Sequence, residues 1–298
     1  MTVATSATPF GRVLTAMVTP MKPGGDIDYE GAGSLAAYLV EHGSDGLVIS
    51  GTTGESATTS DEEKESLLRA VVEAVGDRAL VLAGVGTNDT VHTSELARQA
   101  EKAGATGLLA VTPYYNKPPQ AGVVAHFTAV AETTDLPMML YDIPGRTALA
   151  LETDTLVRLG EHPRILAVKD AKGDLAATSW LRARSDLAIY SGDDINTLPL
   201  LSIGAVGVVG VVTHVFGTEM AEMIGLYLAG DVNGARAVHL RLLPAFTGFF
   251  RTQGVILTKA ALSLRGLPAG PVRLPLVEAA ADQVDQLKAD IAAAGLEL

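Results

Sequence analysis

Lys169 is the residue whose position in this sequence most favours covalent chemistry. It follows the apolar run 165–168, so we expect its side chain to leave a buried strand. An ammonium in such a place loses hydration, and its pKa falls because the charged form is disfavoured. A neutral amine near pH 7 can attack a ketone carbonyl and form a Schiff base. The alternative is a lysine that caps a strand end with its head in water, and position alone leaves both interpretations open.

Tyr141 ends the apolar run that precedes the run of Lys169. Neighbouring strands lie about 4.8 Å apart, so the two side chains are predicted to be close. A phenol there could exchange a proton with the carbinolamine that forms on Lys169. The alternative is a half-buried strand tyrosine whose hydroxyl is satisfied.

Two segments nearby could receive carboxylates. Residues 51–54, Gly-Thr-Thr-Gly, form a predicted turn with free backbone amides and threonine hydroxyls. Arg146 follows Pro144 and Gly145 in a predicted loop and is the obvious local cation. Gly/Thr turns are common, however, and an arginine paired with a surface acid is the alternative for Arg146.

Short apolar runs that end in Gly, Pro, Ser, Thr or Asp predict the strands that would position these residues. There are eight of them: 13–19, 46–50, 79–84, 107–112, 137–142, 164–170, 187–192 and 207–212. Helical patterns lie between most of them. Residues 61–75 form one, with Ser60 as N-cap and Glu63 three residues later, and 93–103 form another, ended by Gly104.

Eight strands that alternate with helices predict an α/β protein, a (β/α)₈ TIM barrel. The polar residues above all follow strands, which places them at the carboxyl end of the barrel, where such folds carry their chemistry. After about residue 230 the strand pattern stops. We predict a catalytic barrel over 1–230 and a C-terminal three-helix appendage over 231–298, punctuated by prolines at 244, 268, 271 and 275.

Composition excludes several classes of function. The formal net charge is -12, which disfavours nucleic-acid and membrane partners. The chain has no cysteine, so disulfides, thiolate metal sites and cysteine nucleophiles are absent. The N-terminal segment has no basic start followed by an apolar run, and no stretch reaches the roughly 20 apolar residues of a spanning helix. We expect a cytoplasmic protein.

Six segments, in order along the barrel, resemble the dihydrodipicolinate synthase and N-acetylneuraminate lyase superfamily of class I aldolases. They are GTTGES (51–56), VTPYYNKP (111–118), LYDIPGRT (140–147), VKDA (168–171), SGDD (191–194) and GVVGV (207–211). The C-terminal helices resemble those of the family as well. The resemblance implies a TIM barrel and a reaction that needs neither a cofactor nor a metal.

The resemblance also implies roles for individual residues. Lys169 would form the Schiff base with pyruvate, and Tyr141 would be the central proton donor and acceptor. Thr52 and Tyr115 would complete a proton relay, with Tyr115 reaching in from a neighbouring subunit. The remaining implied residues bind substrate: Thr53 the pyruvate carboxylate, Val209 and Gly192 the pyruvate adduct, and Arg146 the carboxylate of the second substrate.

Within the family, Thr52-Thr53 and Arg146 favour the members that condense pyruvate with L-aspartate 4-semialdehyde for lysine and diaminopimelate biosynthesis. Asp142 and Gly145 depart from the family, where asparagine and serine are usual. A homo-oligomer is implied, a tetramer built as a dimer of dimers. The family's lysine-inhibition site is matched by Ser56, Ala57, Asn88 and Tyr114. Because His92 stands where glutamate is usual, and Asp61 and Lys64 replace histidines, we expect weak or absent lysine inhibition.

Three other functions stay open on the sequence. A sister class I pyruvate aldolase would act on N-acetylneuraminate, a 2-keto-3-deoxy sugar acid or 4-hydroxy-2-oxoglutarate. A non-catalytic binding homologue is disfavoured because the lysine, the tyrosine and both threonines are present. A metal-dependent barrel enzyme would need converging His, Asp and Glu ligands, and of the six histidines only His214 closely follows a predicted strand near the site.

Overall fold

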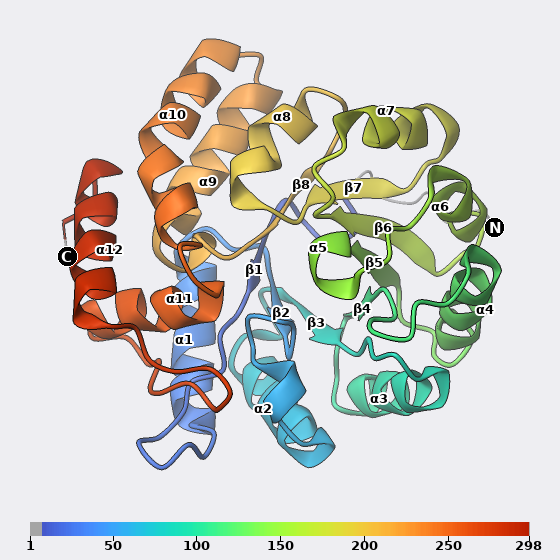
Figure 1. The fold of residues 1–298 in the computed structure, drawn as a ribbon, viewed down its shortest axis with the longest axis horizontal. Coiled ribbons are helices and arrows are strands. Elements are labelled where there is room, and N and C mark those ends of the chain that lie inside the picture. The colour runs from blue at the N-terminus through green and yellow to red at the C-terminus, as the bar shows by residue number, and fades with distance from the viewer. Residues whose placement is uncertain (1–7, 298) are drawn as a thin grey trace.

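The computed structural model describes residues 8–297, in which eight parallel strands pair in chain order and close into a barrel (Figure 1). Each strand lies within its predicted range, so the predicted (β/α)₈ barrel is confirmed. The strands are β1 (Val13–Ala16), β2 (Gly46–Ile49), β3 (Leu80–Gly84), β4 (Gly107–Val111), β5 (Met138–Asp142), β6 (Ile165–Asp170), β7 (Ala188–Ser191) and β8 (Gly207–Gly210).

Helices surround the barrel and connect successive strands (Figure 1). The predicted start of α2 is confirmed, since Ser60 and Glu63 form a complete capping box. The other predicted helix, α3, begins earlier than expected because Asp89 caps it. The helices of the barrel are α1 (Tyr29–Glu41), α2 (Asp61–Val75), α3 (Thr90–Lys102), α4 (Gln120–Ala131), α5 (Pro144–Thr147), α6 (Thr153–Leu159), α7 (Leu175–Arg184), α8 (Thr197–Leu201) and α9 (Thr213–Leu228), with short 3₁₀ turns η1 (Ser56–Thr58) and η2 (Asp194–Asn196).

The alternation of side chains along β6 determines which residues reach the inside of the barrel. Ala167 packs in the barrel interior, while Val168 packs in the larger core between the strands and the helices. Successive strand residues point to opposite faces, so Lys169 points to the same side as Ala167. The same argument places Tyr141 inside, with Met139 before it. The two residues predicted to do chemistry therefore share one interior.

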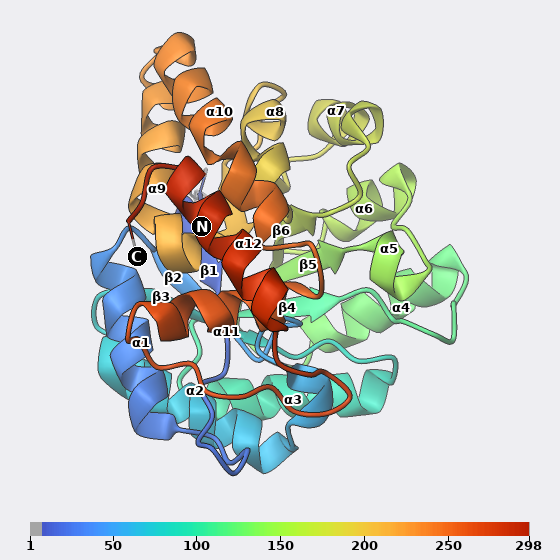
Figure 2. The ribbon, with the colours of Figure 1, turned by 60° about the vertical axis from the view of Figure 1, so that its left-hand side comes forward.

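Three helices form the C-terminal region, as predicted: α10 (Val232–Gly248), α11 (Gly254–Leu264) and α12 (Ala281–Ala293). Figure 2 shows them together on one side of the barrel, with α12 against α10 and α11. The proposed boundary at residue 230 falls in the turn between α9 and α10. Phe246 and Leu257 share one apolar cluster with Val208 of β8, so the appendage packs directly on the barrel.

Two local predictions were wrong. Arg146 lies in the one-turn helix α5 and not in a loop, because Pro144 at its first position fits a helix start. Pro244 lies inside α10 and does not separate two helices. A proline removes the hydrogen bond to the carbonyl four residues back. That carbonyl belongs to the exposed Leu240, where water can replace the lost donor.

No helix within residues 8–297 is long and apolar enough to cross a membrane. The first seven residues, on which the predicted absence of a signal peptide partly depends, lie outside the described residues.

Candidate active site

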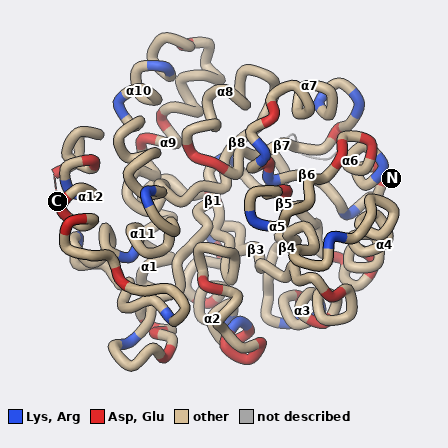
Figure 3. The backbone as a smooth tube through the Cα atoms, viewed as in Figure 1, with Lys and Arg blue, Asp and Glu red and all other residues tan. Residues whose placement is uncertain are grey.

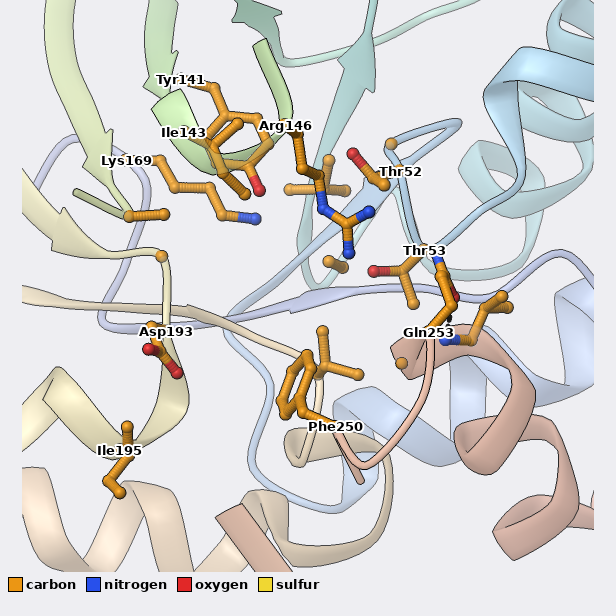
Figure 4. Close-up of a pocket in the computed structure, with 18 of the residues that line it drawn as sticks. Thr52, Thr53, Tyr141, Ile143, Arg146, Lys169, Asp193, Ile195, Phe250 and Gln253 are labelled. Atoms are coloured by element: carbon orange, nitrogen blue, oxygen red, sulfur yellow. Dashed lines mark hydrogen bonds between the residues drawn. The ribbon is translucent and has the colours of Figure 1, made fainter. Parts of the chain in front are cut away.

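A cavity of about 470 Å³ lies at the carboxyl end of the strands. Six of the residues predicted from the sequence line it together: Lys169, Tyr141, Thr52, Thr53, Arg146 and Gly192. Figure 4 shows the Lys169 amine and the Arg146 guanidinium pointing into this space, with Thr52 and Thr53 across from Lys169.

Lys169 and Tyr141 are direct neighbours on paired strands, as predicted. The Lys169 Nζ lies 4.2 Å from the centre of the Tyr141 ring, and Lys169 is only 4% exposed. Burial lowers the pKa of Lys169 to about 8, the Asp194 carboxylate acts to raise it, and the Arg146 charge lowers it further. A substantial fraction of this amine is therefore neutral near pH 8, as attack on a ketone requires.

Burial raises the pKa of Tyr141 to about 12. The positive charge of Arg146 and the polar side chain of Thr52 act in the opposite direction, while Asp193 raises the pKa further. The phenol therefore holds its proton at neutral pH and can donate it to an oxygen that develops negative charge next to Lys169.

The turn at residues 51–54 presents unpaired donors to the cavity. Two amides at its end form hydrogen bonds within the same segment: Gly54 N–H donates to Gly51 O, and the N–H of the next residue, Glu55, donates to Thr52 O. The amides of Thr52 and Thr53 donate to no described residue. Two adjacent free N–H groups and the Thr53 hydroxyl form an arrangement that can receive a carboxylate.

Arg146 projects into the cavity from α5, which Figure 3 shows as a basic position over the barrel mouth. The helix is held by the Thr147 hydroxyl, which lies 3.0 Å from Ile143 O and 2.8 Å from Leu149 O. Arg146 forms no ion pair with a residue in the range 8–297. Its guanidinium is thus available for an anionic ligand.

Gly192 and Asp194 shape the wall behind Lys169. A Cβ at Gly192 would lie 3.0 Å from Lys169 Cγ, so a larger residue would displace the lysine side chain. The buried Asp194 carboxylate accepts from the amides of Val211 (3.0 Å) and Val212 (3.3 Å). Burial raises the pKa of Asp194 to about 6. Asp194 belongs to the SGDD motif (191–194), but no role for it was predicted from the sequence.

Two predicted residues do not line the cavity. Val209 is fully buried in the barrel interior, and Val211 lines the cavity, so a contact of Val209 with the pyruvate adduct stays a prediction. Tyr115 is 88% exposed and lies outside the cavity of its own chain.

Phe250 and Gln253, which were not predicted from the sequence, line the cavity opposite Lys169 (Figure 4). Both come from the segment between α10 and α11. No local pattern identifies them, because they reach the cavity only through the packing of the C-terminal helices on the barrel.

Asp142, a departure from the family, has a local partner. Its fully buried carboxylate lies 3.1 Å from Lys172 Nζ and accepts from the amide of Leu151. Burial raises the pKa of Asp142, and the Lys172 ammonium acts to lower it. Lys172 thus compensates for a charge that asparagine would not carry.

The environment of His214 disfavours the metal-dependent alternative. The Val18 amide donates to Nε2 (3.0 Å), which makes Nδ1 the protonated nitrogen, and Nδ1 donates to Val211 O (2.7 Å). Neither ring nitrogen has a free lone pair for a metal ion. His214 instead joins the chain segments that follow β1 and β8.

A second cavity, of about 610 Å³, adjoins the first, and Thr52, Arg146 and Gln253 line both. All four residues of the predicted regulatory site line it: Ser56, Ala57, Asn88 and Tyr114. The structure thus brings them together, although their role stays a prediction.

The chain is similar to known proteins over nearly its whole length. Residues 9–294 match the model of the dihydrodipicolinate synthetase family. A relative from Acidothermus cellulolyticus named 4-hydroxy-tetrahydrodipicolinate synthase is 70% identical, covering 99% of this chain and 96% of its own. One from Streptomyces coelicolor, named 4-hydroxy-tetrahydrodipicolinate synthase 2, is 62% identical over 99% of both chains.

A crystal structure of the synthase from Cyanidioschyzon merolae with lysine bound superimposes with a TM-score of 0.95. It is 46% identical and covers 96% of this chain and 99% of its own. Together with the matched motifs and the closed barrel, these likenesses confirm the predicted family. The chain belongs to the dihydrodipicolinate synthetase family.

Proposed function

We propose that this protein condenses pyruvate with L-aspartate 4-semialdehyde to give 4-hydroxy-tetrahydrodipicolinate and water, the reaction for which its relatives are named. One observation carries the proposal. The buried amine of Lys169 shares one cavity with two candidate anion sites, the free amides of the 51–54 turn and the guanidinium of Arg146. One site suits the carboxylate of pyruvate, and the other suits the carboxylate of a second substrate.

In the proposed reaction the neutral Lys169 amine attacks the pyruvate ketone. Tyr141 donates a proton to the resulting hydroxyl, water leaves, and a Schiff base remains. Loss of a methyl proton gives an enamine, whose carbon attacks the aldehyde of the second substrate bound to Arg146. The amino group of that substrate then attacks the Schiff-base carbon, which closes the ring and releases Lys169.

Thr52 and Tyr115 complete the proposed proton relay with Tyr141, and Thr53 binds the pyruvate carboxylate. The position of Thr52 and Tyr141 in the lining of one cavity supports this assignment. Tyr115 is proposed to act from a partner subunit, since its exposure supports a role outside its own chain. We therefore propose a homotetramer, and the biosynthetic role makes the cytoplasm its proposed location.

The second substrate is tested by supplying different aldehydes. With pyruvate and aspartate semialdehyde, cyclised product forms; with pyruvate and N-acetylmannosamine, no condensation product is expected. The variant Arg146→Met should raise the KM for the semialdehyde at least ten-fold. The pyruvate adduct should still form, with its pH dependence moved to higher pH because Arg146 no longer lowers the pKa of Lys169. Turnover of the sugar in preference to the semialdehyde would instead support the sister aldolase.

A further inference from the structure

A buried ion pair ties the 51–54 turn to the C-terminal helices. Lys259 Nζ of α11 lies 2.7 Å from Glu55 Oε1, and the two side chains are 3% and 1% exposed. The ammonium also donates to Pro271 O at 2.6 Å. The other carboxylate oxygen, Oε2, accepts from the backbone amide of Arg273 at 2.8 Å. Glu55, at the end of the turn, therefore contacts two segments, at Lys259 and at Arg273, that lie more than 200 residues later in the sequence.

The backbone of the turn is in an unfavourable conformation that needs contacts such as this ion pair to hold it. Glu55 has φ 55° and Ser50 has φ 57°, so left-handed residues that are not glycine flank the turn on both sides. This conformation is unfavourable for residues with a Cβ and persists when surrounding contacts hold it in place. Thr19 Oγ1 holds the preceding residue by donating to Gly54 O at 2.6 Å. The contacts of Glu55 hold the end of the turn.

The ion pair of Glu55 with Lys259 also connects two walls of the cavity. The turn carries the free amides of Thr52 and Thr53, while the segment before α11 carries Gln253. Lys259 lies in α11 itself, so the position of this helix and the position of the turn depend on the same charge pair. A shift of either element changes where the amides point relative to Lys169.

We propose that Glu55 and Lys259 are positioning residues that set the affinity for the carboxylate of pyruvate. Neither contacts the substrate; they act by fixing the turn whose amides receive it. The proposal rests on the proposed function, because it assumes that pyruvate binds at this turn. It differs from a purely structural role, in which the pair would stabilise the fold without changing pyruvate binding.

The double variant E55Q/K259M separates the two roles. A single substitution leaves one charge buried without its partner, whereas the double variant removes both charges together. We expect the double variant to recover most of the melting temperature that E55Q loses. The half-saturating pyruvate concentration of the double variant is measured by reductive trapping of the adduct. It should still exceed that of the parent, by about ten-fold for each hydrogen bond to the pyruvate carboxylate that is misaligned. The maximal rate of trapping should change little.

Asp290→Asn provides the matched control. Asp290 pairs with Arg251 at 2.7 Å and is nearly buried, but this pair joins α12 to the segment between α10 and α11 and not to the 51–54 turn. We expect this variant to lose stability and to bind pyruvate like the parent. A double variant E55Q/K259M that takes up pyruvate at the parent concentration would overturn the proposal. Failure of the parent protein to form any adduct would instead contradict the proposed function, so the two failures are distinguishable.

Discussion

Burial of the Lys169 amine is the property on which the proposed chemistry depends. The apolar strand around it disfavours the ammonium, and the nearby Arg146 acts in the same direction. The Asp194 carboxylate limits the effect, since it stabilises the charged form. The balance leaves an amine that titrates near physiological pH and that lies against a phenol which stays protonated.

The rate of adduct formation should therefore rise with pH and level off above about pH 8, where Lys169 has lost its proton. Between about 8 and the ordinary lysine value of 10.5, the unfolded chain binds more protons than the folded chain, so stability contributed by this residue increases with pH. Initial rates of trapping by cyanoborohydride, followed across this range, provide the measurement. A midpoint near 10.5 would show that burial does not control this amine.

Replacing Tyr141 with phenylalanine should lower kcat about 100- to 10,000-fold, because a positioned proton donor contributes that much. Tyr190→Phe is a matched control in the same barrel. Tyr190 pairs with Lys169 across β6 and β7, but its hydroxyl donates to Gly11 O and accepts from the Phe10 amide, and it does not line the cavity. The control should lose stability and retain turnover. Equal loss of turnover in both variants would contradict the role of Tyr141.

At the scale of elements, η1, α2 and α3 build the second cavity and decide what it can bind. Two carboxylates line it: Glu55, which pairs with Lys259, and Asp61 of α2. Asp61 is already engaged by His92 Nε2 (2.8 Å) and by Lys64 Nζ (3.3 Å). Burial acts to raise the pKa of Asp61, but these two partners outweigh it and hold the pKa below its ordinary value. An incoming ammonium would have to compete with both.

We therefore expect lysine to inhibit this protein weakly or not at all. A titration of turnover with lysine checks this, with the variant H92E, in which Asp61 loses His92 as a partner, as the comparison. The variant should be more sensitive to lysine than the parent, since it adds a carboxylate to the cavity. Half-inhibition of the parent at sub-millimolar lysine would contradict the prediction.

Elements with strong local patterns could be predicted from the sequence, and contacts between distant segments could not. The register of Tyr141 and Lys169 follows from two adjacent strands that both end in polar residues. By contrast, Gln253 and the pair of Glu55 with Lys259 depend on how the C-terminal helices pack on the barrel. Arg146 was placed at the correct end of the barrel, yet its helix was missed because one turn is too short to show a period.

At the scale of the whole molecule, the exposure of Tyr115 supports the proposal that a second chain completes the site. Its hydroxyl lies outside the cavity of its own chain, and its backbone has φ 73°, which a bulky residue rarely adopts without support. The proposed assembly would place this residue in the active site of a partner.

Mixing two inactive variants tests this directly. Tyr115→Phe and Lys169→Ala should each lack turnover, and both should sediment as tetramers like the parent. When they are dissociated and reassembled together, sites that combine an intact Lys169 with a partner's intact tyrosine should recover activity. If no activity returns although mixed assemblies form, Tyr115 acts within its own chain and the proposed sharing is wrong.

Covalent capture of pyruvate tests the central claim most directly. The protein is incubated with pyruvate, reduced with borohydride and digested, and the modified peptide is identified by mass spectrometry, with Lys169→Arg as the control. We predict one adduct, on Lys169, that is absent from the control. An adduct on another lysine, or none at all in the folded parent protein, would contradict the proposed mechanism.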